Sequence, residues 1–181
     1  MNPFIAIVLA ALLLALSGCS SEKPPEPQKI SAFVLSLAEK EKLAAFQKEV
    51  LNIESLTDKA LNVATEELKT VLKGGEISID LPSIMDRAKG ESLQAGEALA
   101  KKAIPEGLPP EAKKLLNESK AGFIAAYKGY AESFDAIRSF TTDKNPMTLL
   151  ESRKKNAEAQ EQLKGATEKL TQIMTAAGVV K

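Results

Sequence analysis

The chain has 181 residues, with 24 lysines and arginines balanced by 24 aspartates and glutamates, no histidine and a single cysteine. This composition excludes Ser–His and Cys–His catalysis, internal disulfides, and zinc, copper or haem sites of ordinary ligation, so we expect no metal, no cofactor and no enzymatic activity. The sequence has no basic stripe, so we expect no nucleic acid as a partner. Catalysis by the carboxylates of Asp and Glu is not excluded by composition. These residues mostly stand beside Lys, however, which is typical of a solvated helix face.

The chain begins with a short apolar segment followed by its only cysteine. Residues Phe4 to Leu16, FIAIVLAALLLAL, carry no charge and would make roughly 20 Å of helix, short of the ~30 Å hydrocarbon core of a bilayer. This length favours a signal peptide over residues 1–18. The tetrapeptide Leu16-Ser17-Gly18-Cys19 then resembles the lipobox of bacterial lipoproteins. The alternative is an uncleaved anchor helix with an incidental cysteine.

The lipobox resemblance implies a lipid modification of Cys19. In that family the cysteine sulfur receives a diacylglycerol, the chain is cut before the cysteine, and the new amino group is acylated. Two or more acyl chains anchor a protein stably, because each buried methylene contributes ~0.8 kcal/mol. An Asp after the cysteine marks inner-membrane retention in this family, and Ser20 stands here instead. The resemblance therefore implies an extracytoplasmic protein anchored at the periplasmic face of an outer membrane.

A proline-rich tether follows over residues 19–28. Three prolines within SSEKPPEPQ favour an extended chain without a core of its own, roughly 28 Å long at ~3.1 Å per residue. Residues 29–181 then form one domain, which we expect to be helical nearly throughout because Ala, Leu, Glu, Lys and Gln dominate it.

The first helical segment carries two apolar stripes that do not share a face. One stripe comprises Ile30, Phe33, Val34 and Leu37, and the other begins at Phe46, roughly 160° further around the helix. We therefore expect a short helix over residues 30–39, a bend at the EKEK sequence, and a long helix over residues 42–73. The alternative is one continuous helix.

The remaining signals predict three more helices. Ser83 and Asp86 are spaced as an N-cap pair and predict a shorter helix over residues 83–103, and the EISID sequence before it is predicted to be a loop. Long helices begin at Pro110 and at Pro146, the second capped by Asn145. The predicted fold is all-α: an up-and-down bundle of three long helices, a shorter fourth and a short N-terminal helix.

The last two helices carry seams with different chemistry. The heptad-spaced seam of the first comprises Leu116, Phe123, Tyr127, Tyr130, Phe134 and Ile137. The seam of the second comprises Leu149, Arg153, Asn156, Gln160, Leu163, Thr167, Leu170, Met174 and Ala177, which is polar at its centre.

If a tight turn joins these two helices, they run antiparallel and rise equally per residue. Residues whose numbers add up to about 287 then lie level with each other. Tyr127 then lies opposite Gln160, and Tyr130 lies opposite Asn156. These four residues form a buried hydrogen-bonded layer that fixes helix register, or they line a ligand cavity, or the polar stretch faces solvent.

The sequence predicts a lipid-anchored envelope protein that acts as an interaction or structural module through a helix face, with a protein partner that the sequence does not identify. The alternative is a binding protein for a small or lipidic ligand within the bundle. The mature domain itself resembles no family.

Overall fold

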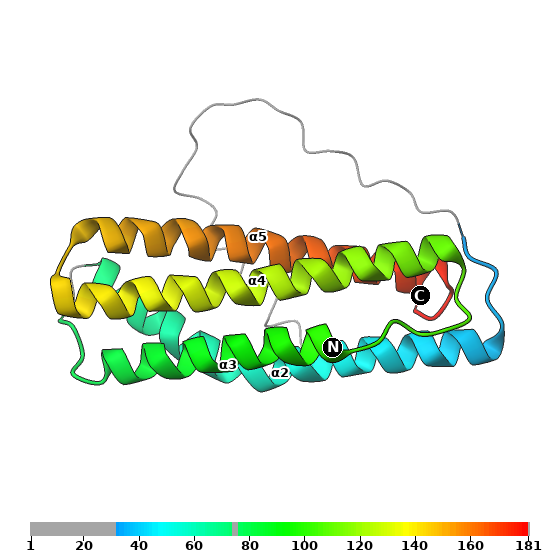
Figure 1. Ribbon diagram of the computed structural model, residues 1–181, viewed down its shortest axis with the longest axis horizontal. Helices are drawn as coiled ribbons and strands as arrows, with labels where there is room; N and C mark the ends of the chain where they lie inside the picture. Colours follow the sequence, from blue (N-terminus) through cyan, green and yellow to red (C-terminus); the bar gives the residue numbers. More distant parts are fainter. Residues whose placement is uncertain (1–31, 74–75, 181) are drawn as a thin grey trace, which may run out of the picture.

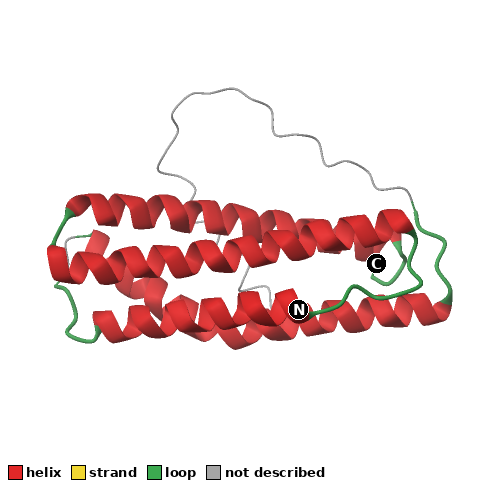
Figure 2. Ribbon diagram, viewed as in Figure 1, coloured by secondary structure: helices red, strands yellow, loops and turns green. Residues whose placement is uncertain are grey.

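The computed structural model describes residues 32–73 and 76–180, and these residues contain four helices. Successive helices run in opposite directions and lie side by side in an elongated bundle (Figure 1). Loops join them at the two ends of the bundle (Figure 2). The helices are α2 (Leu37–Leu72), α3 (Leu81–Lys101), α4 (Pro110–Asp143) and α5 (Pro146–Ala176).

The predicted all-helical class and the relative helix lengths are confirmed. α2, α4 and α5 have 36, 34 and 31 residues, and α3 has 21. No strand occurs in residues 32–73 or 76–180, and residues 76–78 of the EISID sequence are loop, as predicted.

The predicted short helix over residues 30–39 is wrong for residues 32–36, which are extended, while residues 30 and 31 lie outside the described residues. Phe33 and Leu35 pack on the core and Val34 between them is 98% exposed, which is the two-residue alternation of an extended chain. The N–H of Phe33 donates to the carbonyl of Ala176 at 2.9 Å. This segment therefore runs along the end of α5 instead of coiling.

α2 begins at Leu37 and passes through the EKEK sequence without the predicted bend. Ser36 is its N-cap, and a capping box joins the two residues reciprocally: the Ser36 hydroxyl accepts from the N–H of Glu39, and the Glu39 carboxylate accepts from the N–H of Ser36 at 2.7 Å. The Ser36 hydroxyl also donates to the Glu39 carboxylate at 2.7 Å, and this hydrogen bond, with that from the Ser36 N–H, holds the pKa of the Glu39 carboxyl below its usual value. The cap fixes the entry of the chain into α2.

The predicted start of α3 is also wrong, by two residues. Asp80 is the N-cap, Pro82 lies in the first turn, and no side chain caps the helix. Asp86 forms an ion pair with Arg138 of α4, with 3.1 Å between Nε and Oδ2. Its carboxylate therefore joins two helices instead of capping one.

The signals for α4 and α5 are confirmed. α4 begins at Pro110, and the side chain of Asn145 caps α5 by accepting from the N–H of Met147 at 3.0 Å. Lys144 between them has a φ of 54°, so the connection is a tight left-handed turn. The predicted seam of α4 is buried throughout: Leu116, Phe123, Tyr127, Tyr130, Phe134 and Ile137.

The four helices do not pack with equal closeness. The contact between α4 and α5 is the most extensive, that between α3 and α4 is next, and α2 meets α3 less extensively and α5 at few points. α2 is therefore the most loosely held helix of the bundle. Within residues 32–73 and 76–180, none of the helices is both long and apolar enough to cross a membrane.

Candidate functional site

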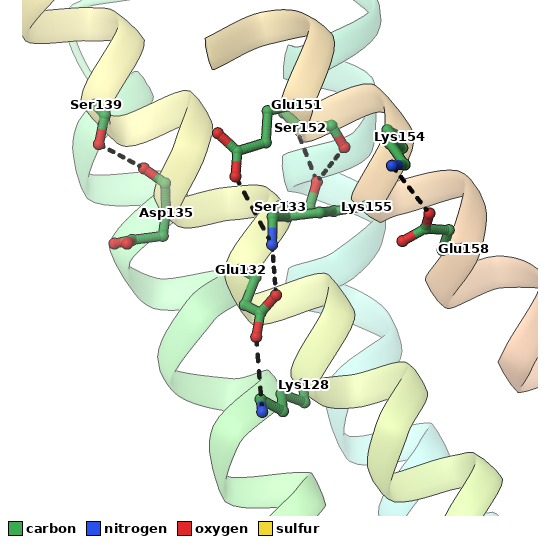
Figure 3. A network of polar contacts seen from close by, with 10 residues as sticks. All are labelled: Lys128, Glu132, Ser133, Asp135, Ser139, Glu151, Ser152, Lys154, Lys155 and Glu158. Atoms are coloured by element: carbon green, nitrogen blue, oxygen red, sulfur yellow. Dashed lines mark hydrogen bonds and ion pairs between the residues drawn. The ribbon is translucent and has the colours of Figure 1, made fainter.

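Pairs of residues across the α4–α5 contact confirm the predicted register of these two helices. The Ser133 and Ser152 hydroxyl oxygens lie 3.0 Å apart, and the ammonium of Lys155 lies 2.6 Å from the carboxylate of Glu132. Figure 3 shows both contacts between the two helices, with Lys155 reaching Glu132 and Glu151. This register places Asn156 level with Tyr130, as predicted.

The rotation of α5 about its axis differs from the prediction. The face of α5 that meets α4 carries the small residues Ser152, Ala159 and Ala166, which approach Ser133, Gly129 and Gly122. Arg153 and Thr167 of the predicted seam are exposed. Small side chains let the two backbones approach closely, so they form the contact with α4. Of the predicted seam, Leu170, Met174 and Ala177 belong to the core and Leu163 packs against it.

Tyr127 extends across the bundle to α2. Its side chain is 1% exposed, and its hydroxyl lies 3.4 Å from the Thr57 hydroxyl. Its Cβ lies against Gly96 of α3, where an added Cβ would be 3.8 Å away. Burial raises the pKa of the Tyr127 hydroxyl far above its usual value. Tyr127 and Gln160 are level but share no hydrogen bond.

Tyr130 lies one turn further along α4 and is 8% exposed. Its ring centroid lies 6.4 Å from that of Phe134 and 6.5 Å from that of Tyr127. Burial, with the nearby carboxylate of Asp58, raises the pKa of the Tyr130 hydroxyl to about 12. Within residues 32–73 and 76–180, no hydrogen bond joins its hydroxyl to another residue, Asn156 included.

The two amides of the predicted layer bond to each other within α5. Gln160 is half-buried, and its Nε2 donates to Oδ1 of Asn156 at 2.9 Å. Asn156 is 8% exposed, and its Nδ2 is buried without a hydrogen-bond partner in the part of the chain that the structure describes. A buried donor without a partner is uncommon in native structures and needs a physical reason.

Sequence reasoning missed three residues of α2 that lie beside the tyrosines: Glu54, Thr57 and Asp58. Thr57 is 3% exposed, Glu54 is half-buried and Asp58 is exposed. Burial, together with the negative charge of Asp58, raises the pKa of the Glu54 carboxyl to about 7, and partial desolvation by the surrounding protein raises the pKa of the exposed Asp58. The spacing of Thr57 from Ile53 and Ala60, at helical intervals of four and three, was the available signal.

Together these residues form a polar layer in the middle of the bundle, which we define as Glu54, Thr57 and Asp58 of α2, Tyr127 and Tyr130 of α4, and Asn156 and Gln160 of α5. Carboxylates, hydroxyls and amides supply mainly hydrogen-bond acceptors there.

Two surface depressions lie elsewhere on the bundle. One of about 220 Å³ runs along α4 and α5 beside Gly129 and Lys155, and one of about 250 Å³ lies beside Asn52 and Lys102. Neither is lined by a residue of the polar layer. Cys19, the predicted lipidation site, lies outside the described residues.

Compared with models of protein families, with curated proteins and with solved structures, the chain matches none.

Proposed function

We propose that this chain is a lipid-anchored module of the bacterial envelope that holds a protein partner on one side of its helical bundle. The lipobox-like Leu16-Ser17-Gly18-Cys19 and the proline-rich tether after it support the anchor. The modified Cys19 inserts its diacylglycerol and acyl chains into the membrane, and Ser20 directs the protein to the periplasmic face of the outer membrane. The tether holds the bundle clear of the lipid headgroups.

The observation that carries the partner face is the exposure of large apolar side chains on α2. Leu56 and Val63 stand seven residues apart on one side of this helix and are 69% and 45% exposed. A spacing of seven places two side chains within about 20° on a helix. A partner helix that covers this side removes both from water. α2 suits this role because it packs least tightly with the rest of the bundle.

Site-specific photo-cross-linking in the source bacterium tests the partner face. We expect p-benzoyl-phenylalanine in place of Leu56 to give one discrete cross-linked product in the membrane fraction. The same group in place of Lys164, an exposed residue of α5, is the control and should give none. Val63→Glu, combined with the probe at position 56, should remove the product. Cross-links of equal yield from both positions contradict the proposal.

The anchor is tested separately by mass spectrometry of the mature amino terminus and by membrane fractionation. We expect a triacylated Cys19 as the first residue, and a protein that leaves the membrane fraction when Cys19→Ala is introduced. An unmodified Cys19, or cleavage elsewhere, contradicts the lipid anchor. The cross-linking experiment still tests the partner face in that case, because it does not depend on the anchor's chemistry.

A further inference from the structure

The stripe of α2 that carries Leu56 and Val63 lies on the side of this helix that meets α3. Glu49 stands seven residues before Leu56 and Val63 stands seven after it, so all three lie within about 40° of one another around the helix. The carboxylate of Glu49 pairs with the ammonium of Lys102, at the end of α3, at 3.0 Å. Leu56 and Val63 therefore stand along the line where α2 and α3 run side by side (Figure 1).

A depression in the surface lies one turn before Leu56 on this line. It has a volume of about 250 Å³ and is lined by Lys48, Glu49, Asn52, Ile53 and Lys102. Ile53 is 9% exposed, and the aliphatic parts of the two lysines add apolar surface around it. A concave apolar surface beside the projecting Leu56 is complementary to side chains of another protein, whereas a lipid layer is flat.

Two lysines beside this surface form no ion pair within residues 32–73 and 76–180: Lys48 and Lys59. Both are exposed, and their spacing of eleven residues places them within about 20° around α2 and roughly 16 Å apart along it. Every basic residue of α3 and its C-cap, in contrast, pairs with a carboxylate. The unpaired carboxylates on this side of α2, Glu41 and Glu67, lie about two turns beyond the lysines. The surface around Leu56 is therefore positive.

We propose that the partner segment is an amphipathic helix with acidic residues along one side of its apolar stripe, which lies along the line between α2 and α3. This proposal rests on the partner face described under the proposed function. One apolar side chain of the partner enters the depression at Ile53 and its neighbours cover Leu56 and Val63, because a helix presents apolar residues at intervals of three, four and seven. Carboxylates about three turns apart then lie against Lys48 and Lys59.

A second copy of α2 is less complementary to this surface than an acidic helix. Identical chains commonly associate about a two-fold axis. An axis that packs Leu56 of one copy on Val63 of the other also places the two Lys59 residues opposite each other. Because like charges across an interface repel, a different chain with carboxylates at these positions is favoured.

Photo-cross-linking at the depression tests the proposal in the source bacterium. We place p-benzoyl-phenylalanine at Asn52 of the full chain, an exposed and uncharged residue that lines the depression. We expect the same product that position 56 gives. Mass spectrometry should locate the cross-link in a partner segment whose apolar residues recur at intervals of three and four. Asp or Glu residues should stand ten or eleven positions apart in that segment.

Matched charge reversals test the two lysines. Lys48→Glu together with Lys59→Glu should reduce the yield from position 52 at least about fivefold, because two attractions become repulsions. Lys154→Glu together with Lys164→Glu changes the net charge equally on α5 and should leave the yield unchanged. Replacing the two mapped carboxylates of the partner by lysine should restore the product of the first pair. Circular dichroism confirms that each variant keeps its helical content.

Equal yields from the two charge-reversed chains overturn the acidic helix. So does a product from position 56 without one from position 52, and in both cases the partner face itself stands. A product of twice the mass of this chain would identify a second copy, and a phospholipid adduct would identify a membrane surface, and either result overturns the proposal. The absence of a product at both positions contradicts the partner face.

Discussion

The hydroxyl groups of Thr57 on α2 and Tyr127 on α4 lie 3.4 Å apart in the core of the bundle. The two hydroxyl groups differ in the number of hydrogen-bond partners they have. The Thr57 hydroxyl also lies 3.0 Å from the carbonyl oxygen of Ile53, one turn back in its own helix. The Tyr127 hydroxyl has no second hydrogen bond among the described residues. Removing Thr57 therefore isolates a buried phenol, whereas removing the phenol leaves Thr57 with a partner.

We expect Thr57→Val to cost about 1–3 kcal/mol of unfolding free energy, the penalty for a buried hydroxyl without a partner. Tyr127→Phe should cost less, about 0.5–1.5 kcal/mol, and the double variant should cost less than the sum of both. Urea denaturation followed by circular dichroism measures all three. Thr70→Val is the control, since Thr70 is exposed, and should be neutral within about 0.5 kcal/mol. Equal losses of unfolding free energy in Thr57→Val and Tyr127→Phe would contradict this difference between the two hydroxyl groups.

A second prediction concerns the close approach of α4 to α5 at Gly129. A Cβ added there would lie 3.0 Å from the Cβ of Ala159, closer than ordinary van der Waals contact. Gly129→Ala should therefore destabilise the protein by about 1–3 kcal/mol, although alanine is the better helix former. Thermal and urea denaturation measure the change.

The matched control is Gly165→Ala, at a helical glycine with open space around it. This substitution should stabilise the protein by about 0.5–1 kcal/mol, because alanine loses less backbone entropy on folding. Ala159→Gly combined with Gly129→Ala should recover part of the loss. A stabilising Gly129→Ala would show that the two helices can separate at no cost.

Much of this fold could be predicted because large apolar residues and helix caps form recognisable patterns in the sequence. The spacing from Phe123 to Ile137 identifies the buried side of α4, and Asn145 before Pro146 identifies the start of α5. The Ser36 and Glu39 pair was an equally good signal for the start of α2. The helical spacing of Ile30, Phe33, Val34 and Leu37 competes with this signal, because it predicts a helix that begins before Ser36.

The site was harder to predict because its members carry weak or misleading patterns. Ser152, Ala159 and Ala166 form the α5 contact with α4, yet small residues contribute little to an apolar stripe. The seven-residue spacing of Gly122 and Gly129 was the better clue to this contact. Glu54 stands in a segment whose charged residues are typical of an exposed helix face. It is half-buried only because of where the neighbouring helices lie.

A third prediction follows from the raised pKa of Glu54, which is about 7 in the folded protein against an ordinary value of 4.5. The folded state favours the protonated carboxyl, so its contribution to stability is full below pH 4.5 and is lost as the pH rises through about 7. Asp58 acts in the same direction, since its pKa is also raised, and Tyr127 and Tyr130 stay neutral throughout this range.

Comparison of the wild type with Glu54→Gln isolates this effect from the other carboxyl groups. The variant's stability relative to the wild type should increase between pH 4.5 and pH 8 by on the order of 1–2 kcal/mol, after allowance for solvent screening. Urea midpoints at several pH values measure the difference. A difference that does not change with pH would mean that Glu54 titrates as it does in the unfolded chain.

The last prediction concerns Asn156, whose Nδ2 is buried without a partner while its Oδ1 accepts from Gln160. Asn156→Leu removes the unpaired donor and adds apolar surface level with Tyr130, on the inward side of α5. The lost bond to Gln160 costs little, because Gln160 is half-buried and its amide can turn to water. We therefore expect the free energy of unfolding to rise or to change by less than about 0.5 kcal/mol. Asn156→Ala, which removes the same donor but leaves space, should be less stable than Asn156→Leu. Urea denaturation of both variants gives the comparison, and a loss of about 2 kcal/mol or more in Asn156→Leu would show instead that Asn156 completes a satisfied hydrogen-bonded layer.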